Sequence, residues 1–209
     1  MYRPPPFRED RTEILHQAIR DHPLGSLVTA GPAGLLANLL PFTLVDTAAG
    51  PVLRAHLARA NDQLTDLRSS TPALVLFHGP QAYVTPAWYA SKATHGKVVP
   101  TWNYVTVQVR GTPRVIDDAQ WLGEQIERLT HDHEGARERP WSVSDAPADF
   151  IASQLRAIAG IEIPVTQIEG KWKVSQNRSA ADRSMVATGL AAEGKHAVAQ
   201  VMQSLEPLA

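Results

Sequence analysis

Hydrophobic residues near the start of the chain recur at helical spacing, whereas those that follow recur in short alternating runs. Residues 11–21 carry Leu15, Ala18 and Ile19 on one face, which predicts an amphipathic helix. The prolines at positions 4–6 predict an extended arm before this helix, because proline fixes φ and cannot continue a helix.

From residue 24 onward the apolar runs are short and are separated by glycine and proline, as in antiparallel sheets. Val105, Val107 and Val109 alternate with polar residues, so 103–110 is the clearest predicted strand. The other predicted strands are 24–30, 35–40, 52–58, 73–78, 81–85, 114–116, 161–168 and 171–175.

Helices are predicted mainly in the second half of the chain. Asp117 and Asp118 can cap a helix that carries Leu122 and Ile126 on one stripe. A helix over about 147–158 should bury Phe150, Ile151, Leu155 and Ile158. Ser179 and Asp182 predict the cap of a helix that carries Met185, Val186 and Leu190. A last predicted helix carries Val198, Val201, Met202 and Leu205.

This order of elements predicts a mainly β protein with peripheral helices (α+β). Six to eight mostly antiparallel strands come early, and no alternation of strand and helix favours a doubly wound sheet. A closed or split barrel with helices packed on its outside fits best. Because no repeat or linker is visible, residues 1–209 are predicted to form one domain, with an N-terminal arm and helix and C-terminal helices.

The amino-acid composition excludes several classes of function. The 209 residues are 44% hydrophobic and 20% charged, with a net charge of −1 and no cysteine. Disulfides, zinc–thiolate sites and thiol nucleophiles are thereby excluded, and no basic surplus for phosphate-driven DNA binding is present. The first residues lack the apolar core of a signal peptide, and no apolar stretch is long enough for a bilayer, so we expect a cytoplasmic protein without membrane contact.

A first candidate for chemistry follows the strand at 52–58. His56, Arg59 and Asn61 there could supply the cation and the short donors that a phosphate monoester needs. A solvated strand end with scattered polar residues explains the same pattern, since no strict phosphate motif is present.

Two aromatic segments are further candidates. Trp88 and Tyr89 follow a proline and could stack on a planar ligand or pack a barrel mouth. Trp102, Asn103 and Tyr104 open the clearest strand, and the Asn103 amide suits the edge of a heterocycle or, alternatively, a structured turn.

A fourth segment, 169–178, combines cations with an aromatic ring and amides, and could bind a polyanion or an amide-rich ring system. A solvated basic strand is the alternative. A metal site at His131 and His133 is disfavoured, because a spacing of two on a helix turns the side chains to different faces. We therefore predict no metal.

Five motifs, in order, carry a resemblance to one family: MYRPPPF, HLARAN, YVTPAWYASK, KVVPTWNYVTVQVRG and GKWKVSQNRS. Together they resemble the PaiB-like proteins, also called FMN-binding negative transcriptional regulators. The resemblance extends from Met1 to about Leu190, and GKWKVSQNR and VPTWNY are its most specific pieces.

The resemblance implies an FMN-binding split barrel, shared with pyridoxamine-phosphate oxidases, in which two subunits hold FMN in a groove between them. By similarity, Arg59, Ala60 and Asn61 would lie at the phosphate with His56 nearby. The isoalloxazine side would be lined by Trp102, Asn103 and Tyr104, and approached from the C-terminal part by Lys171, Trp172, Ser175, Gln176 and Arg178.

The sequence departs from the family in two motifs. Relatives often read HLARANPQW, where this chain has Asp62 and Leu64, and they commonly carry a histidine where Gln108 stands. The first departure bears on the packing of the phosphate turn, and the second weakens any role for a titrating group there.

The resemblance implies a flavin-binding regulator that acts as a homodimer, with DNA or a regulatory protein as its partner. No helix-turn-helix signature supports direct DNA binding. A flavin-dependent oxidoreductase of the pyridoxamine-phosphate-oxidase type, in which the flavin carries the hydride chemistry, is a second hypothesis. A haem-binding or haem-degrading barrel is a third.

Overall fold

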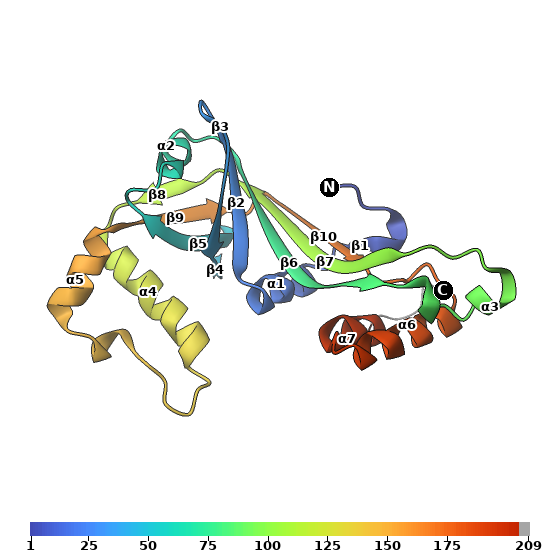
Figure 1. Ribbon diagram of the computed structural model, residues 1–209. Coiled ribbons are helices and arrows are strands. Elements are labelled where there is room, and N and C mark those ends of the chain that lie inside the picture. Colours follow the sequence, from blue (N-terminus) through green and yellow to red (C-terminus); the bar gives the residue numbers. More distant parts are fainter. Residues whose placement is uncertain (205–209) are drawn as a thin grey trace. The chain divides into compact units, whose positions relative to one another are not determined.

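The computed structural model describes residues 1–204. Its strands are β1 Arg8–Glu9, β2 Leu24–Gly31, β3 Gly34–Pro41, β4 Thr43–Thr47, β5 Gly50–Ala58, β6 Ala73–Val84, β7 Thr101–Gly111, β8 Arg114–Ile116, β9 Ile158–Pro164 and β10 Gln167–Lys173. The α-helices are α1 Thr12–Asp21, α2 Gln63–Arg68, α3 Lys92–His95, α4 Ala119–Glu134, α5 Ala148–Arg156, α6 Ala180–Ala192 and α7 His196–Ser204 (Figure 1). Single 3₁₀ turns lie at Pro5–Phe7, Pro86–Trp88 and Val143–Asp145 (η1, η2 and η3).

The strands form a six-stranded sheet of order β1-β10-β7-β6-β2-β3 and a four-stranded sheet of order β4-β5-β9-β8. Within the described residues, the chain divides into two compact units. The first contains Met1–Asp21, His78–Gln108 and the residues from Glu169 onward; the second contains His22–Phe77 and Val109–Ile168. Strands β6, β7 and β10 each contribute residues to both units.

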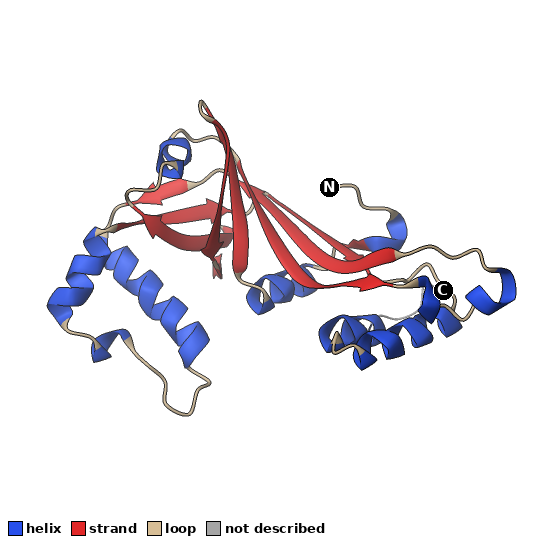
Figure 2. Ribbon diagram, in the orientation of Figure 1, coloured by secondary structure: helices blue, strands red, loops and turns tan. Residues whose placement is uncertain are grey.

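The first unit packs helices against one face of its strands. Leu15 of α1 is buried, and a β-carbon on Gly170 of β10 would meet its side chain at 2.2 Å. Helices α6 and α7 lie side by side (Figure 2), and their core is formed by Val186, Leu190, Val198 and Met202. Gly189 of α6 allows Trp88 of η2 to approach closely.

The second unit holds the four-stranded sheet with α4 packed on it. The alternation of β5 buries Leu53, Ala55 and Leu57 on one face. On the opposite face the Arg54 guanidinium lies 5.4 Å from the Trp121 ring centroid of α4. A β-carbon on Gly160 of β9 would lie 2.3 Å from the same indole ring, so a glycine is needed there for α4 to dock.

The predicted class is confirmed: the strands are mostly antiparallel and helices are peripheral. Ten strands are present in residues 1–204 rather than six to eight. The two that the sequence did not predict are β1, which is only two residues long, and β4, which lies between two prolines. The two runs predicted at 73–78 and 81–85 form one strand, β6. Leu205 lies outside the described residues.

One burial prediction was wrong. Within α5 no residue is buried, and Phe150 is 53% exposed. The helix is amphipathic, as the sequence indicates, but its main contacts, with α4 and β9, cover its apolar stripe only in part. In residues 1–204, no helix has the length and apolar character required to cross a bilayer.

Candidate functional site

The turn between β5 and α2 carries the predicted phosphate residues Arg59, Ala60 and Asn61. Arg59 is exposed, and its guanidinium pairs with Asp117 and donates to the Arg156 carbonyl at 3.0 Å. Arg68 of α2 pairs with the same Asp117 carboxylate at 2.8 Å. Because Arg68 and then Arg59 hydrogen-bond to it, the pKa of Asp117 is lowered. Two guanidinium groups thus share one carboxylate at an open turn.

A buried polar network supports this turn from below. The Asn61 Oδ1 accepts from the Gln63 backbone N–H at 3.0 Å, which fixes the turn at the start of α2. Gln63 is fully buried, and its amide donates to the Leu27 carbonyl at 3.0 Å and accepts from Asn38 at 2.9 Å. Asp66, one turn later on α2, accepts from the Thr29 hydroxyl at 2.7 Å. The phosphate turn is therefore anchored to β2 and β3 by side chains.

His56 lies in register with Gly160 on the β5 face that also carries Arg54, the face covered by α4. Its Nδ1 is buried and has no hydrogen-bond partner among the described residues. Burial lowers the pKa of His56, so the neutral imidazole is favoured. Arg59 and Asn61 are brought together on the turn, whereas His56 belongs to the strand before it.

In the first unit, a second group of predicted residues forms an open aromatic face. Trp102 is 53% exposed and its ring meets Tyr83 edge-on at 6.2 Å. On the same face of β7, Tyr104 lies beneath the Lys171 ammonium, which is 5.5 Å from its ring centroid and 5.4 Å from that of Tyr2. We call Tyr2, Tyr83, Trp102, Tyr104 and Lys171 the aromatic face.

The other predicted residues of these two segments are buried or form hydrogen bonds within the first unit. Asn103 is fully buried and its amide donates to Ser175 Oγ at 3.0 Å. Trp172 is 7% exposed. The Gln176 side chain accepts from the Val174 N–H and donates to the Trp172 carbonyl, which closes the turn after β10. The Trp-Asn-Tyr segment and the basic C-terminal strand are therefore in direct contact.

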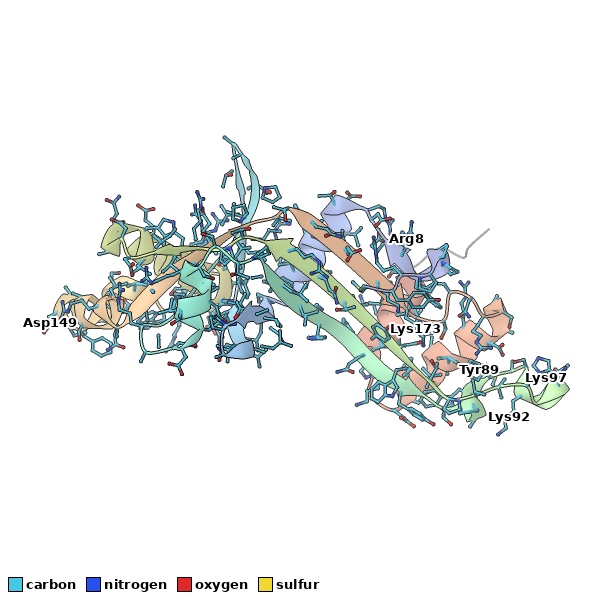
Figure 3. The ribbon with its side chains drawn as sticks, turned by 90° about the horizontal axis from the view of Figure 1, so that it is seen from above. Arg8, Tyr89, Lys92, Lys97, Asp149 and Lys173 are labelled. Carbon is cyan, nitrogen blue, oxygen red and sulfur yellow. The ribbon has the colours of Figure 1, made fainter. Side chains whose placement is uncertain are left out.

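A pocket of about 170 Å³ lies where these two segments meet. Its lining consists of Phe7, Tyr89, Thr101, Asn103, Lys173, Ser175, Asn177 and Arg178. Lys173 and Tyr89 are labelled in Figure 3. Neither was among the predicted contacts, although both lie within segments singled out for their composition. We call this cavity the basic pocket.

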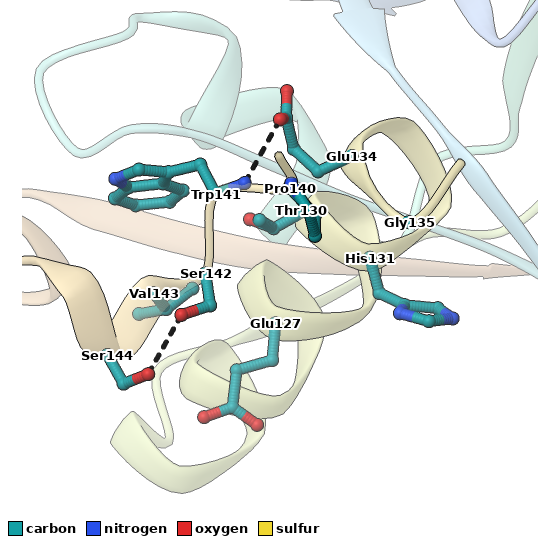
Figure 4. A pocket seen from close by; sticks show the side chains of 10 residues that line it. All are labelled: Glu127, Thr130, His131, Glu134, Gly135, Pro140, Trp141, Ser142, Val143 and Ser144. Atoms are coloured by element: carbon teal, nitrogen blue, oxygen red, sulfur yellow. Dashed lines mark hydrogen bonds between the residues drawn. The ribbon is translucent and has the colours of Figure 1, made fainter. Parts of the chain in front are cut away.

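The second unit has a pocket of about 370 Å³ between α4 and η3 (Figure 4). Two carboxylates, Glu127 and Glu134, line it, and Glu134 accepts from the Trp141 N–H at 3.2 Å and pairs with Arg137 at 3.0 Å. The Glu134 carboxylate is thus already neutralised within the loop. Across residues 1–204, no group of three or more His, Cys, Asp or Glu side chains could hold a metal ion.

Residues 1–167 match the family model described as "Putative FMN-binding domain". The chain belongs to this family. An uncharacterized protein of Emericella nidulans is 38% identical over 87% of this chain and 86% of its own length. The Bacillus subtilis protein named protease synthase and sporulation protein PAI 2 is 27% identical over 99% of this chain and 97% of its own. The predicted PaiB-like resemblance is thereby confirmed, and FMN is the cofactor for which the family is described.

Among solved structures, the FAD and heme binding protein of Mycobacterium smegmatis is similar, with a TM-score of 0.58 at 16% identity. The likeness covers 79% of this chain and 73% of that one, and it establishes a shared fold.

The residues present fit FMN on two counts. A phosphate monoester requires cations at an open backbone turn, which Arg59 and Arg68 supply with only one carboxylate between them. A planar ring system requires exposed aromatic surface, which the half-exposed Trp102 and Tyr83 supply. The cations lie in the second unit and the aromatic surface lies in the first.

Proposed function

We propose that this protein binds FMN, with the phosphate on the β5–α2 turn, and that it works as a homodimeric regulator rather than as an enzyme. The observation that carries the proposal is the shared Asp117. Arg59 and Arg68 share one carboxylate, so each guanidinium keeps hydrogen-bond donors that a phosphate dianion can use. Ala60 adds no bulk beyond its β-carbon at the exposed tip of the turn.

We also propose that the aromatic face contacts the isoalloxazine ring. Trp102 offers an indole ring to solvent, and Lys171 places a cation against Tyr104 on the same face. In this proposal, Asn103, Trp172, Ser175 and Gln176 support the face from behind, because their polar groups bond within the first unit. FMN, once bound, would supply redox chemistry, and the chain would orient and shield it.

A homodimer is supported by an uncovered apolar sheet face in the second unit. Leu35 and Leu39 of β3 are 77% and 63% exposed. Ala37, between them, lies opposite Val28 of β2, which in turn lies opposite Leu74 of β6. A second copy of this chain is the occupant that would bury such a face, because large exposed apolar patches mark interfaces.

A regulatory rather than enzymatic role rests on the relationship to the Bacillus subtilis protein, whose name links it to protease synthesis and sporulation. A net charge of −1 gives no excess of cations for direct phosphate-driven DNA binding, so we propose that regulation runs through a protein partner. Bleaching of bound flavin by NADH or NADPH would instead favour the oxidoreductase hypothesis.

The experiment that tests FMN binding is a titration of flavin fluorescence with the purified full chain. We expect quenching at one FMN per subunit, and an affinity about 10- to 100-fold lower in Arg59→Ala, as expected for the loss of a charged hydrogen bond. Arg128→Ala, which removes an exposed arginine of α4 in the same unit, is the matched control. A wild-type chain that does not quench FMN would refute the proposal.

The ring contact is tested separately by Trp102→Ala. The Trp102 backbone carbonyl that accepts from Lys173 remains in this variant, so the local fold should persist. We expect FMN affinity to fall about 10-fold, in line with loss of one aromatic stacking contact. Trp141→Ala removes a comparably exposed indole from the second unit and should leave affinity unchanged. Equal affinities in the two variants would exclude the aromatic face as the ring site.

A further inference from the structure

The basic pocket of the first unit has cations and hydrogen-bond donors in its lining but no carboxylate. Lys173 and Arg178 contribute the charges, and Thr101, Ser175 and Asn177 contribute neutral polar groups. The acidic residue Asp182 lies close enough to Arg178 to interact electrostatically. Its two oxygens accept from the Ser91 N–H at 2.8 Å and the Ser91 hydroxyl at 2.9 Å. Asp182 therefore also serves as an anchor for the η2–α3 segment.

The hydroxyl of Tyr89 is the polar atom that most directly indicates a ligand in this pocket. The residue is only 2% exposed, and its buried hydroxyl makes no hydrogen bond of ordinary geometry in residues 1–204, although Arg178 lies close enough to interact with it. The Arg178 guanidinium lies 5.0 Å from the centroid of its ring. A buried hydroxyl without a hydrogen bond is destabilising, so such groups usually have a ligand or a water to bond. Burial raises the pKa of Tyr89, which keeps this hydroxyl protonated and able to donate.

Lys173 completes the charge arrangement. Its ammonium donates to the Thr101 hydroxyl and to the Trp102 carbonyl, so it is held in place at the pocket wall. Burial lowers the pKa of Lys173, and the neighbouring charges of Lys171 and Arg178 lower it further. Lys173 and Arg178 line the same cavity and repel each other, so both are stabilised when an anion enters.

The pocket wall also contains an unusual backbone. Ser175 has φ of 68°, in the left-handed region that residues other than glycine seldom adopt. Its hydroxyl is held by the buried Asn103 amide at 3.0 Å. Strain of this kind persists only where the surroundings enforce it, and it is concentrated at ligand sites.

We propose that the basic pocket is a binding site for a small oxyanion, a phosphate or carboxylate group, held by the Tyr89 hydroxyl, Lys173 and Arg178. A volume of about 170 Å³ accommodates such a group with a few waters but not the tricyclic ring of a flavin. The site is separate from the proposed phosphate turn and does not depend on FMN being bound. It gives the protein an anionic effector or substrate group to recognise in addition to the flavin.

The test is calorimetric titration of the full chain with inorganic phosphate and, separately, with acetate, at constant ionic strength. Wild-type protein should bind at least one of them saturably at one site per subunit, and the tighter of the two identifies the oxyanion class. Tyr89→Phe keeps the ring beneath Arg178 and removes only the hydroxyl. It should weaken binding about 10-fold or more without lowering the melting temperature, because the hydroxyl makes no hydrogen bond of ordinary geometry within the protein.

Two controls make the outcomes decisive. Lys195→Met removes an exposed lysine of the first unit and should leave anion affinity unchanged, whereas Lys173→Met should lower it. FMN affinity should be the same in Tyr89→Phe and in wild type. The absence of saturable binding of either anion, or equal anion affinities in Tyr89→Phe and wild type, overturns the proposal. A parallel fall in FMN affinity would also overturn it, because the pocket would then take the flavin's own phosphate.

Discussion

Gly31 and Asp66 are in such close contact that no other residue fits at position 31. A β-carbon on Gly31 would lie 1.7 Å from the Asp66 Oδ1 atom. Asp66 is 3% exposed and its other oxygen accepts from Thr29 at 2.7 Å, so the carboxylate has no room to move aside. The end of β2 and the helix that follows the phosphate turn are fixed together by this contact.

We therefore expect Gly31→Ala to destabilise the fold by about 2 kcal/mol or more, through overpacking of a buried polar site. Chemical denaturation of the two proteins measures the difference. The control is Gly123→Ala in α4, where an added β-carbon meets nothing within 4 Å. That variant should gain up to about 1 kcal/mol from helix propensity. Equal stabilities for the two variants would contradict the contact described above.

This contact shows why part of the fold could be predicted and part could not. Strands β2, β3, β5 and β7 follow from alternating apolar residues, and their predicted bounds agree with the structure within one or two residues. The pairing of Gly31 with Asp66 joins residues that are far apart in the sequence. Gly31 alone indicates only a turn, and Asp66 alone resembles any polar helix residue. No local pattern reports that they touch.

Asp62 is the departure from the family motif that should affect FMN binding. This exposed carboxylate stands next to Asn61 on the phosphate turn, where relatives often have proline. We expect Asp62→Asn to raise FMN affinity by about twofold to fivefold, the range for an exposed charge interaction, and to lose this gain at high salt. Asp132→Asn on α4 is the control in the same unit. A lower affinity in Asp62→Asn would show that the carboxylate supports the turn instead of opposing the phosphate.

His56 makes stability depend on pH. Burial lowers its pKa in the folded chain below the ordinary value of 6.5, so the unfolded chain takes up a proton first as the pH falls. The stabilisation from neutral His56 is complete above the unfolded pKa and is lost as the pH drops below it. The melting temperature should therefore fall between about pH 8 and about pH 5, and less so in His56→Gln. His78→Gln, which replaces an exposed histidine of β6, should keep the wild-type pH dependence.

The sequence could predict those residues of the candidate site whose charge alone suits a ligand. Arg59 and Lys171 carry charges that suit an anionic cofactor wherever the fold places them. The burial of Asn103 and the internal bonds of Gln176 depend on which face of the strand and turn each occupies, and that depends on α6, α7 and the turn at Ser175. The Tyr89 hydroxyl indicates a ligand site because it is buried without an ordinary hydrogen bond, and a sequence does not show this.

The apolar sheet face of β2, β3 and β6 gives the last prediction, which concerns assembly. Leu39 lies opposite Ser26 of β2, which lies opposite Leu76 of β6, so a charge at position 39 would stand in the middle of the face. We expect wild-type protein to sediment as a dimer and Leu39→Glu as a monomer, because a buried unpaired carboxylate is costly at an interface.

Phe150→Glu is the matched control for assembly, since Phe150 is an equally apolar and 53% exposed residue on α5, away from this face. It should remain dimeric. If flavin is held where two subunits meet, Leu39→Glu should also lose FMN affinity. Its thermal unfolding should remain cooperative, as expected for a folded monomer. A wild-type monomer at micromolar concentration would rule out the dimer, and a monomeric Leu39→Glu that retains full FMN affinity would place the flavin entirely within one chain.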